Sequence, residues 1–405
     1  MADALLLEVG VLFGAVAAVG ALANRLGQSV IPFYIVVGML LGPHVVGELA
    51  LPVVGTVYIQ ESEFIAVGAE LGIVLLLFFL GLEFNLDRLI ESRERIGRAG
   101  GIDLAINFGV GLLVGFALFR DPLAAFLTAG IVYISSSAII TKSLIDLGWI
   151  ANDEAAPMLG TLVYEDLFIA VYLAVASALV LGGGDVSEAV TSVGVAIGFI
   201  LLLLLAVYFG TAWFARLLNT GSNEFTVLRA LGTTVLVAGA ALALGVSEAV
   251  AAFFVGMAFS STDHVHDLEN LLEPVRDTFA AVFFFWIGLV TDPSVFGGVA
   301  VPVAVAVVAT TPTKLVSGYL GGRVYDLGPR RSARVGLGMV TRGEFSLIIA
   351  ALALSGAGTT LAAGVADDIY AFAVGYVLVM SVLGTTLMQY SAPFEAFAVR
   401  RFGAD

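Results

Sequence analysis

The sequence contains no cysteine and only three histidines. Without cysteine the chain forms no disulfides, has no thiol nucleophile and offers no thiolate ligands for a metal. The histidines are His44, His264 and His266. The last two lie close together, but no third ligand accompanies them, so we interpret them as part of a solvated acidic loop. We therefore expect no resident metal and no cofactor.

Charge is also scarce, and most of it is negative. Only 13% of the residues are charged, against about 25% in a typical soluble domain, and the formal net charge is −15. Only two of the basic residues are lysines, Lys142 and Lys314. Such a chain has no basic face for nucleic acid, so nucleic-acid binding is excluded. Acid-rich, lysine-poor composition suits high salt, and we predict a halophilic source.

Hydrophobic residues, in contrast, make up 60% of the chain, and the mean hydropathy is +1.03. Many apolar stretches reach the length of about 20 residues that a helix needs to cross a bilayer. The 47 glycines fit close packing between membrane helices. The first residues, MADALLLEVG, lack the basic start and cleavage site of a signal peptide, so they are expected to begin the first membrane helix. The composition predicts an all-α polytopic membrane protein.

Hydropathy and Gly/Pro punctuation predict thirteen membrane helices. They cover residues 4–24, 30–42, 65–84, 99–119, 122–147, 155–181, 187–217, 225–245, 247–261, 274–291, 296–322, 332–357 and 367–392. With the N-terminus outside, every basic residue except Arg120, Lys314 and Arg342 falls in a cytoplasmic segment. The positive-inside rule therefore favours a cell-membrane protein with an outer N-terminus and a cytoplasmic C-terminus. We expect no soluble domain after the last helix.

Two short motifs recur in the same order and indicate an internal repeat. VVGML (36–40) resembles FVGMA (254–258), and FFLGLEFN (78–85) resembles FWIGLVTD (285–292). Each recurrence lies seven helices after the first copy. Because seven is odd, the two copies have opposite orientation in the membrane, which is a hallmark of secondary transporters. On this scheme the first six and last six helices are the two copies, and the seventh helix links them.

An acidic pair, Glu165 and Asp166, lies in the middle of a predicted helix that reads GTLVYEDLFIAVYLAV over 160–175. At about 1.5 Å per residue, Asp166 is about 16 Å from the predicted start of that helix. Intramembrane charges are costly, so they mark functional sites by default. Two adjacent carboxylates can hold protons, or release them and hold a metal cation. A static salt bridge within the bundle is the alternative interpretation.

Lys314 is a second intramembrane charge, eight residues or about 12 Å from the inner end of its predicted helix. A lysine at this depth needs an anionic partner or becomes neutral. Glu165 and Asp166 are the obvious partners. Pro312 is expected to loosen the helix just before the lysine. The alternative is a lysine that snorkels to the membrane surface.

Polar residues interrupt two further predicted helices at similar depth. Ser135, Ser136 and Ser137 lie within FLTAGIVYISSSAIITKSL (126–144), and Arg342 and Glu344 flank a glycine within GLGMVTRGEFSLIIAALAL (336–354). Broken helices that cross at the midplane aim their half-helix ends at an ion. Serines that pack helices, and a plain ion pair of Arg342 with Glu344 or with another helix, are the alternatives.

Three polar residues are weaker candidates. Glu83 lies at a helix end and is expected to be solvated. Asp103 is expected either to line a cytoplasmic funnel or to pair with Arg98. Asn107 is the third of these weaker candidates.

Taken in order, these motifs resemble the cation:proton antiporter-2 family, which includes Kef-type and NapA-type exchangers. The matching segments are GLEFNLDRL, YISSSAII, the acidic pair, the membrane lysine and TRGEFSLI, and the resemblance covers essentially the whole chain. It implies the sodium/proton antiporter fold, with about thirteen helices in two inverted repeats whose broken helices cross. It also implies a homodimer in which a core domain moves against a dimerisation domain.

The resemblance implies a division of the chain as follows. The dimerisation domain comprises 1–98 and 225–295, the core ion-transport domain comprises 99–182 and 296–405 with a short tail, and 183–224 is the linker helix.

The resemblance also implies roles for single residues. Asp166 matches the ion-binding aspartate, and Lys314 matches the lysine of the electrogenic members. Ser135–Ser137, Arg342 and Glu344 fall in the two crossing helices. Glu165 departs from the pattern, because sodium-type members carry Asp there, electroneutral relatives carry Asn and Kef-type members carry Gln.

We therefore expect a secondary transporter that exchanges Na⁺ (or K⁺ or Li⁺) for H⁺ by an elevator-like motion and serves pH homeostasis, with Asp166 as the ligand of the transported cation. One alternative is a Kef-type K⁺/H⁺ antiporter without its regulatory domain, and a passive cation channel is another. We expect no enzyme activity. A membrane aspartyl protease typically carries GxGD, and the sequence has no such motif.

Overall fold

The computed structural model describes residues 2–45, 59–83, 86–181, 222–243, 248–260 and 265–403, with a few single positions between these ranges. The predicted helix 187–217 lies almost entirely outside the described residues. By packing, the chain forms two compact units. Unit 1 comprises Met1–Ala23, Phe33–Leu86 and Ala170–Pro293, and unit 2 comprises Asn24–Pro32, Asp87–Ile169 and Ser294–Asp405.

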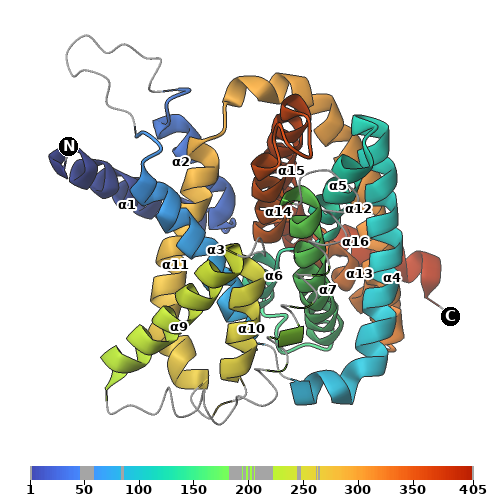
Figure 1. Ribbon diagram of the computed structural model, residues 1–405. Helices are drawn as coiled ribbons and strands as arrows, with labels where there is room; N and C mark the ends of the chain where they lie inside the picture. The colour runs from blue at the N-terminus through green and yellow to red at the C-terminus, as the bar shows by residue number, and fades with distance from the viewer. Residues whose placement is uncertain are drawn as a thin grey trace. The chain divides into compact units, whose positions relative to one another are not determined.

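Four helices of unit 1, α3, α9, α10 and α11, pack against one another. Helix α3 packs on both α10 and α11, and α9 packs on α10. The described helices of unit 1 are α1 (Ala2–Arg25), α2 (Val30–Leu41), α3 (Glu63–Glu83), α9 (Asn223–Ala243), α10 (Glu248–Ser260) and α11 (Val265–Leu289), labelled in Figure 1.

The repeated glycine motifs are points of close helix approach within unit 1. Gly38 lies so close to α11 that a Cβ there would overlap the carbonyl oxygen of Phe285. Gly256 lies equally close to α3, against the carbonyl oxygen of Phe78. In both cases, the first motif of one predicted repeat packs against the second motif of the other repeat. Small residues allow such contact between membrane helices.

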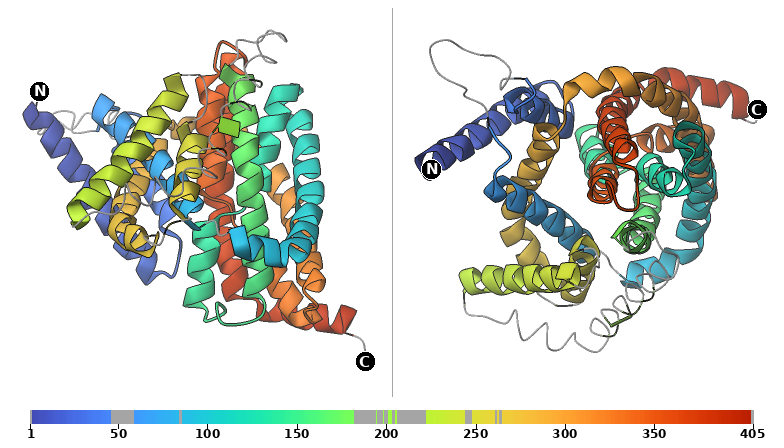
Figure 2. Two further views of the ribbon diagram at one scale, coloured as in Figure 1. Left: turned by 60° about the horizontal axis from the view of Figure 1, so that its bottom comes forward. Right: turned by 45° about the horizontal axis from the view of Figure 1, so that its top comes forward.

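Unit 2 holds the remaining described helices, and α4, α7 and α15 run roughly parallel in it (Figure 2, left). Helix α12 packs on α13 and α15, α14 packs on α5 and α15, and α13 packs on α16. The elements are α4 (Leu86–Phe119), α5 (Pro122–Tyr133), α6 (Ser137–Asp146), α7 (Ala155–Leu181), η1 (Pro293–Val295), α12 (Phe296–Val324), α13 (Pro329–Gly338), α14 (Glu344–Ser355), α15 (Ala363–Gln389) and α16 (Ala392–Phe402). Only the first half of α7, to Ile169, belongs to unit 2.

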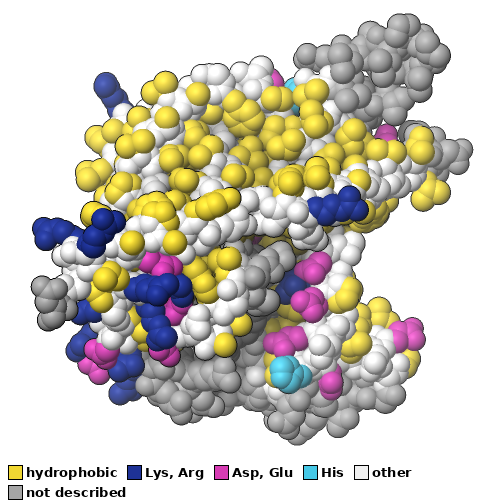
Figure 3. All heavy atoms as spheres, turned by 180° about the vertical axis from the view of Figure 1, so that it is seen from behind, with side chains coloured by type: hydrophobic (Ala, Val, Ile, Leu, Met, Phe, Trp, Pro, Cys, Tyr) yellow, Lys and Arg dark blue, Asp and Glu magenta, His cyan; other side chains and the backbone are white. Residues whose placement is uncertain are grey.

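Seven described helices are long and apolar enough to cross a membrane, and four further apolar helices are shorter. Two of these shorter helices, α5 and α14, are halves of predicted helices that the structure breaks. On the face drawn in Figure 3, hydrophobic side chains form a wide band, as expected for a surface in contact with lipid. Val301 and Val308 of α12 and Leu113 of α4 are among the most exposed hydrophobic side chains of the described residues.

Several predicted boundaries were wrong. Helix α4 begins at Leu86 rather than at residue 99, and α11 begins at Val265 rather than at residue 274. In both cases the helix extends beyond its apolar part into a charged stretch that hydropathy had marked as loop. Helix α12 runs unbroken through Pro312. Helix α16 was not predicted as an element, because it was interpreted as a tail.

Candidate functional site

Two chain breaks meet inside unit 2. The first separates α5 from α6, where Ile134 adopts an extended backbone conformation. The second separates α13 from α14 and ends at Gly343. The backbone N–H of Ser136 donates to the carbonyl oxygen of Thr341 across the two breaks (3.3 Å). Ser136 Oγ occupies the space that a Cβ of Gly343 would fill, so this contact requires glycine. The predicted polar interruptions are therefore adjacent in space.

Glu344 lies where two half-helices begin. It is the first residue of α14, and its carboxylate accepts hydrogen bonds from Ser136 Oγ (2.7 Å) and Ser137 Oγ (3.1 Å) at the start of α6. Helix N-termini carry partial positive charge, which a carboxylate offsets. Glu344 is almost fully buried. The carboxylate of Glu344 thus offsets the partial positive charge at the N-termini of both α6 and α14.

Arg342 binds the carbonyl groups at the C-terminal ends of the other two half-helices, α5 and α13. Its Nη1 donates to the carbonyl oxygens of Met339 (3.1 Å), Val340 (3.0 Å) and Thr341 (2.8 Å), which follow α13. Its Nε donates to the carbonyl oxygen of Val132 in the last turn of α5 (2.9 Å). Helix C-termini carry partial negative charge and unpaired carbonyls, so a buried cation stabilises them. Arg342 is fully buried.

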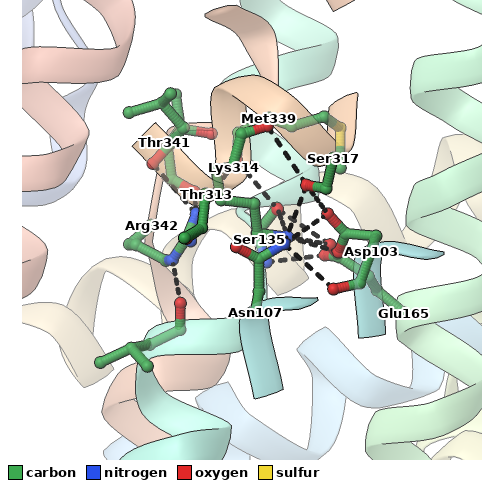
Figure 4. A network of polar contacts seen from close by, with 12 residues as sticks. Asp103, Asn107, Ser135, Glu165, Thr313, Lys314, Ser317, Met339, Thr341 and Arg342 are labelled. Atoms are coloured by element: carbon green, nitrogen blue, oxygen red, sulfur yellow. Dashed lines mark hydrogen bonds and ion pairs between the residues drawn. The ribbon is translucent and has the colours of Figure 1, made fainter. Parts of the chain in front are cut away.

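Lys314 of α12 binds two carboxylates, as Figure 4 shows. Its Nζ lies 2.6 Å from Glu165 Oε1 of α7 and 2.6 Å from Asp103 Oδ2 of α4. A third bond, of 3.1 Å, goes to Ser135 Oγ. An ammonium group has three N–H donors, so these three acceptors match its full capacity. The side chain is fully buried, which excludes the snorkelling interpretation.

Ser135 joins this ion pair to the broken helix. Its backbone N–H donates to Glu165 Oε2 (2.7 Å), and its hydroxyl lies 3.0 Å from Glu165 Oε1. The N–H is available because helix α5 ends at Tyr133, before Ser135. The same hydroxyl lies 3.2 Å from the carbonyl oxygen of Met339, at the other break. Glu165 is fully buried, so the bonds to Lys314 and Ser135 offset its desolvation.

Asp103, only a weaker candidate from the sequence, belongs to this cluster. Asp103 Oδ1 accepts from Asn107 Nδ2 (2.9 Å) and Ser317 Oγ (2.6 Å), while Oδ2 accepts from Lys314. Of the two alternatives for Asp103, the pair with Arg98 was wrong, because Arg98 binds Glu94 (2.6 Å). An acid within the apolar stretch that follows Gly100 and Gly101 was the available signal.

Asp166 follows Glu165 on α7 and is 6% exposed. Consecutive helix residues diverge by about 100° around the axis, so the two carboxylates point in different directions from one helix. The ring of Tyr133 faces the cluster, with Lys314 Nζ 5.0 Å from its centroid. Adjacent carboxylates that face different surroundings can take different roles.

His44 and His266, the two histidines that the structure describes, belong to unit 1 and are not part of this site. His266 is exposed in the first turn of α11, rather than in a loop, and its Nδ1 lies 3.0 Å from Glu269 Oε2. His264 and the side chain of Glu83 lie outside the described residues. Among the described residues, no group of three or more His, Cys, Asp and Glu has the arrangement of a metal site.

Broken helices that cross at buried charges, together with long apolar spans, define a secondary transporter of the membrane. A family model described as sodium/hydrogen exchanger, transmembrane, matches residues 12–390. The chain therefore belongs to the sodium/hydrogen exchanger family, and it is a membrane cation/proton antiporter.

Two relatives and one solved structure illustrate the match. The K(+)/H(+) antiporter subunit KhtU of Bacillus subtilis is 38% identical over 390 residues, covering 96% of this chain and 94% of the relative. The ammonium/H(+) antiporter subunit AmhT of Alkalihalophilus pseudofirmus is 32% identical over 346 residues, covering 82% and 83%. The sodium proton antiporter MjNhaP1 from Methanocaldococcus jannaschii at pH 8 aligns with a TM-score of 0.70 over 99% of this chain and 100% of that chain, at 14% identity. The predicted sodium/proton antiporter fold is confirmed, whereas the number of membrane helices and the inverted repeats stay predictions.

Proposed function

We propose that the protein exchanges a monovalent cation for protons through Asp166 and Glu165. This proposal rests mainly on the fully buried ion pair between Glu165 and Lys314. Glu165 is the residue next to Asp166, and the ion pair lies beside the crossing of the two broken helices. A buried ion pair that served stability alone is often replaceable by apolar residues. A proton-sensitive pair next to an ion ligand gives this arrangement a transport role.

In the proposed cycle, Asp166 binds either the cation or a proton. A proton that reaches Glu165 neutralises its carboxylate and weakens the attraction to Lys314. When the proton leaves, the ion pair forms again. Occupancy by protons and by the cation is therefore mutually exclusive at the acidic pair, which is the condition for coupled exchange. Glu344 and Arg342 continue to offset the partial charges at the half-helix ends during this cycle.

Two cations are candidates. The sequence motifs favour Na⁺, as set out above. The name of KhtU, which is 38% identical, favours K⁺. Carboxylate oxygens bind either ion, so the choice depends on the size of the site and the number of its ligands. Transport currents measured with Na⁺ and with K⁺ in one preparation, at the same pH, distinguish the two.

The division into two compact units supports an elevator-like motion. The charged residues of the candidate site all belong to unit 2: Asp103, Glu165, Asp166, Lys314, Arg342 and Glu344. In the proposed motion this unit carries the cation across the membrane, while unit 1 mediates homodimerisation. Relative motion of domains is the default where they are separate compact bodies.

The charges at one end of unit 2 support a cytoplasmic C-terminus. Arg95 near the start of α4 pairs with Asp326, which follows α12. Arg330 and Arg334 of α13 pair with Glu395 of α16 at the same end. Basic residues gather on the cytoplasmic side of membrane proteins. The proposed location is the cell membrane, with the N-terminus outside.

The test uses proteoliposomes that contain a pH dye and receive pulses of Na⁺, K⁺ or Li⁺. Wild-type protein is expected to move protons when the cation is added. Asp166→Asn is expected to abolish this response. Asp326→Asn, a substitution of an exposed acid, is the matched control and is expected to transport like wild type. Exchange by Asp166→Asn at the wild-type rate would show that Asp166 is not the cation- and proton-binding residue.

A further inference from the structure

Helix α16 follows the last long span, α15, after only two residues, Tyr390 and Ser391. Figure 2 shows it running at a steep angle to α15 (left). Because α15 is long and apolar enough to cross the membrane, its end marks a boundary between lipid and water. Helix α16 therefore starts at that boundary and runs along it rather than through the bilayer.

One face of α16 is fixed to unit 2. Glu395, which is 5% exposed, accepts hydrogen bonds from Arg330 Nε (2.6 Å) and Arg334 Nε (2.7 Å) of α13. Ser391 Oγ adds a bond of 2.8 Å. Ala398, one turn further along, is also buried. Helix α16 is thus held in one orientation, with its acidic side chain turned inward and neutralised.

The rest of α16 presents aromatic and basic side chains outward. Phe394, Phe397 and Phe402 are 40%, 61% and 54% exposed. Arg400 and Arg401 in the last turn are exposed as well. Exposed aromatic side chains next to basic ones, on a short helix with no exposed acid between them, are typical of helices that lie in the headgroup region.

We infer that α16 is an interfacial helix that inserts its phenylalanines below the phospholipid headgroups and binds anionic headgroups through Arg400 and Arg401. Two features favour lipid over a protein partner as the occupant. The exposed face continues directly from the end of a membrane span, and its only exposed charges are positive, which complements anionic lipid. Trp and Tyr often occupy this level of the membrane, and Tyr390, between α15 and α16, is 69% exposed.

Helix α13 connects the inferred lipid contact of α16 with the transport site. Helix α16 binds the first turns of α13, and the residues that follow α13 carry Arg342 to the crossing. A lipid-bound α16 therefore holds the half-helix α13 at a fixed depth. Interfacial binding itself is independent of which cation is transported.

The absence of cysteine makes a direct test possible, because one introduced cysteine takes one spin label. The label is placed at Phe397→Cys, at buried Ala398→Cys and at exposed Glu94→Cys of α4, in full-length protein reconstituted in phosphatidylcholine with or without phosphatidylglycerol. Collision with O₂, which concentrates in lipid, is compared with collision with a water-soluble nickel chelate.

The expected result is that the label at 397 collides mainly with O₂, the label at 94 mainly with the nickel chelate, and the label at 398 weakly with both. Phosphatidylglycerol is expected to move the label at 397 deeper, and Arg400→Gln with Arg401→Gln to remove that shift. Collision at 397 mainly with the nickel chelate would overturn the inference. Weak collision with both reagents at 397 would also overturn it, since another protein copy would then cover the helix. Neither outcome depends on transport, so the proposed function is tested separately.

Discussion

The ammonium group of Lys314 lies 2.6 Å from the carboxylate of Asp103, 211 residues away in the sequence. The same ammonium group lies 2.6 Å from Glu165. One buried lysine therefore has two buried acids as partners, and they come from different helices. Asp103 is in turn held by Asn107 and Ser317. If Glu165 is protonated during transport, Lys314 still has an anionic partner and its charge remains compensated.

Replacement of Asp103 by Asn is predicted to retain exchange and to move its half-maximal activity to lower pH. The substitution removes one negative charge from a cluster that also contains Lys314, Glu165, Asp166 and Tyr133. With fewer negative charges nearby, a proton on the remaining acids is less favourable, so cations compete at lower pH. The measurement is a pH series of cation-driven proton movement in proteoliposomes.

The matched control for this prediction is Glu154→Gln. Glu154 is equally buried and pairs with Arg334 at 2.6 Å, outside the site. Its loss is expected to weaken the fold without moving the pH profile. Asp103→Glu should restore the wild-type profile. An Asp103→Asn profile that coincides with that of Glu154→Gln would show that Asp103 has only a structural role.

Replacement of Lys314 by Met is predicted to destabilise unit 2 and to abolish normal coupling. The change leaves Asp103 and Glu165 facing each other without a counter-charge, and breaking a buried ion pair in this way costs about 3–5 kcal/mol. Protonation of one acid relieves the repulsion, so the loss of thermal stability should shrink as the pH falls. Melting temperatures of the purified protein over a pH series measure this effect. Lys314→Arg, which keeps the charge, should lose less stability, and equal loss in both variants would contradict the account.

The ion pairs of α16 predict a second pH effect, outside the membrane spans. Burial alone would raise the pKa of Glu395, but hydrogen bonds from Arg334, Arg330 and Ser391 hold that pKa below its ordinary value of 4.5. A carboxylate with a lowered pKa in the folded state stabilises the fold above 4.5 and loses this contribution as the pH falls through the lowered value.

Glu395→Gln should therefore melt at a lower temperature than wild type at neutral pH and approach wild type in acid. Thermal melts in detergent at neutral pH and below pH 4.5 provide the comparison. Glu273→Gln is the control, because Glu273 is an exposed acid that lies 3.3 Å from Arg276 in unit 1. A constant difference between Glu395→Gln and wild type over the whole pH range would disprove the electrostatic explanation.

The sequence was sufficient to predict those parts of the site in which a charged or polar residue lies within an apolar helix. Lys314 in an apolar helix required an anion, and the polar interruptions at Ser135–Ser137 and Gly343 indicated broken helices. The sequence did not indicate which helix supplies the second acid, because the approach of Asp103 to Lys314 depends on how α4 packs in unit 2. Hydropathy also placed the start of α4 too late, since it marks the membrane boundary, whereas Glu, Arg and Leu continue the helix beyond it.

Replacement of Gly343 by Ala is predicted to abolish exchange while leaving the protein folded. A methyl group at 343 would overlap Ser136 Oγ, so the two breaks would have to move apart. That movement would disturb the bonds from Ser136 and Ser137 to Glu344, and small displacements at a reacting site reduce rates strongly. Gly297→Ala in α12 is the matched control, because nothing lies within 4 Å of a Cβ built there. We expect the control to transport like wild type in proteoliposomes. Equal transport by Gly343→Ala would show that this close contact is not required for exchange.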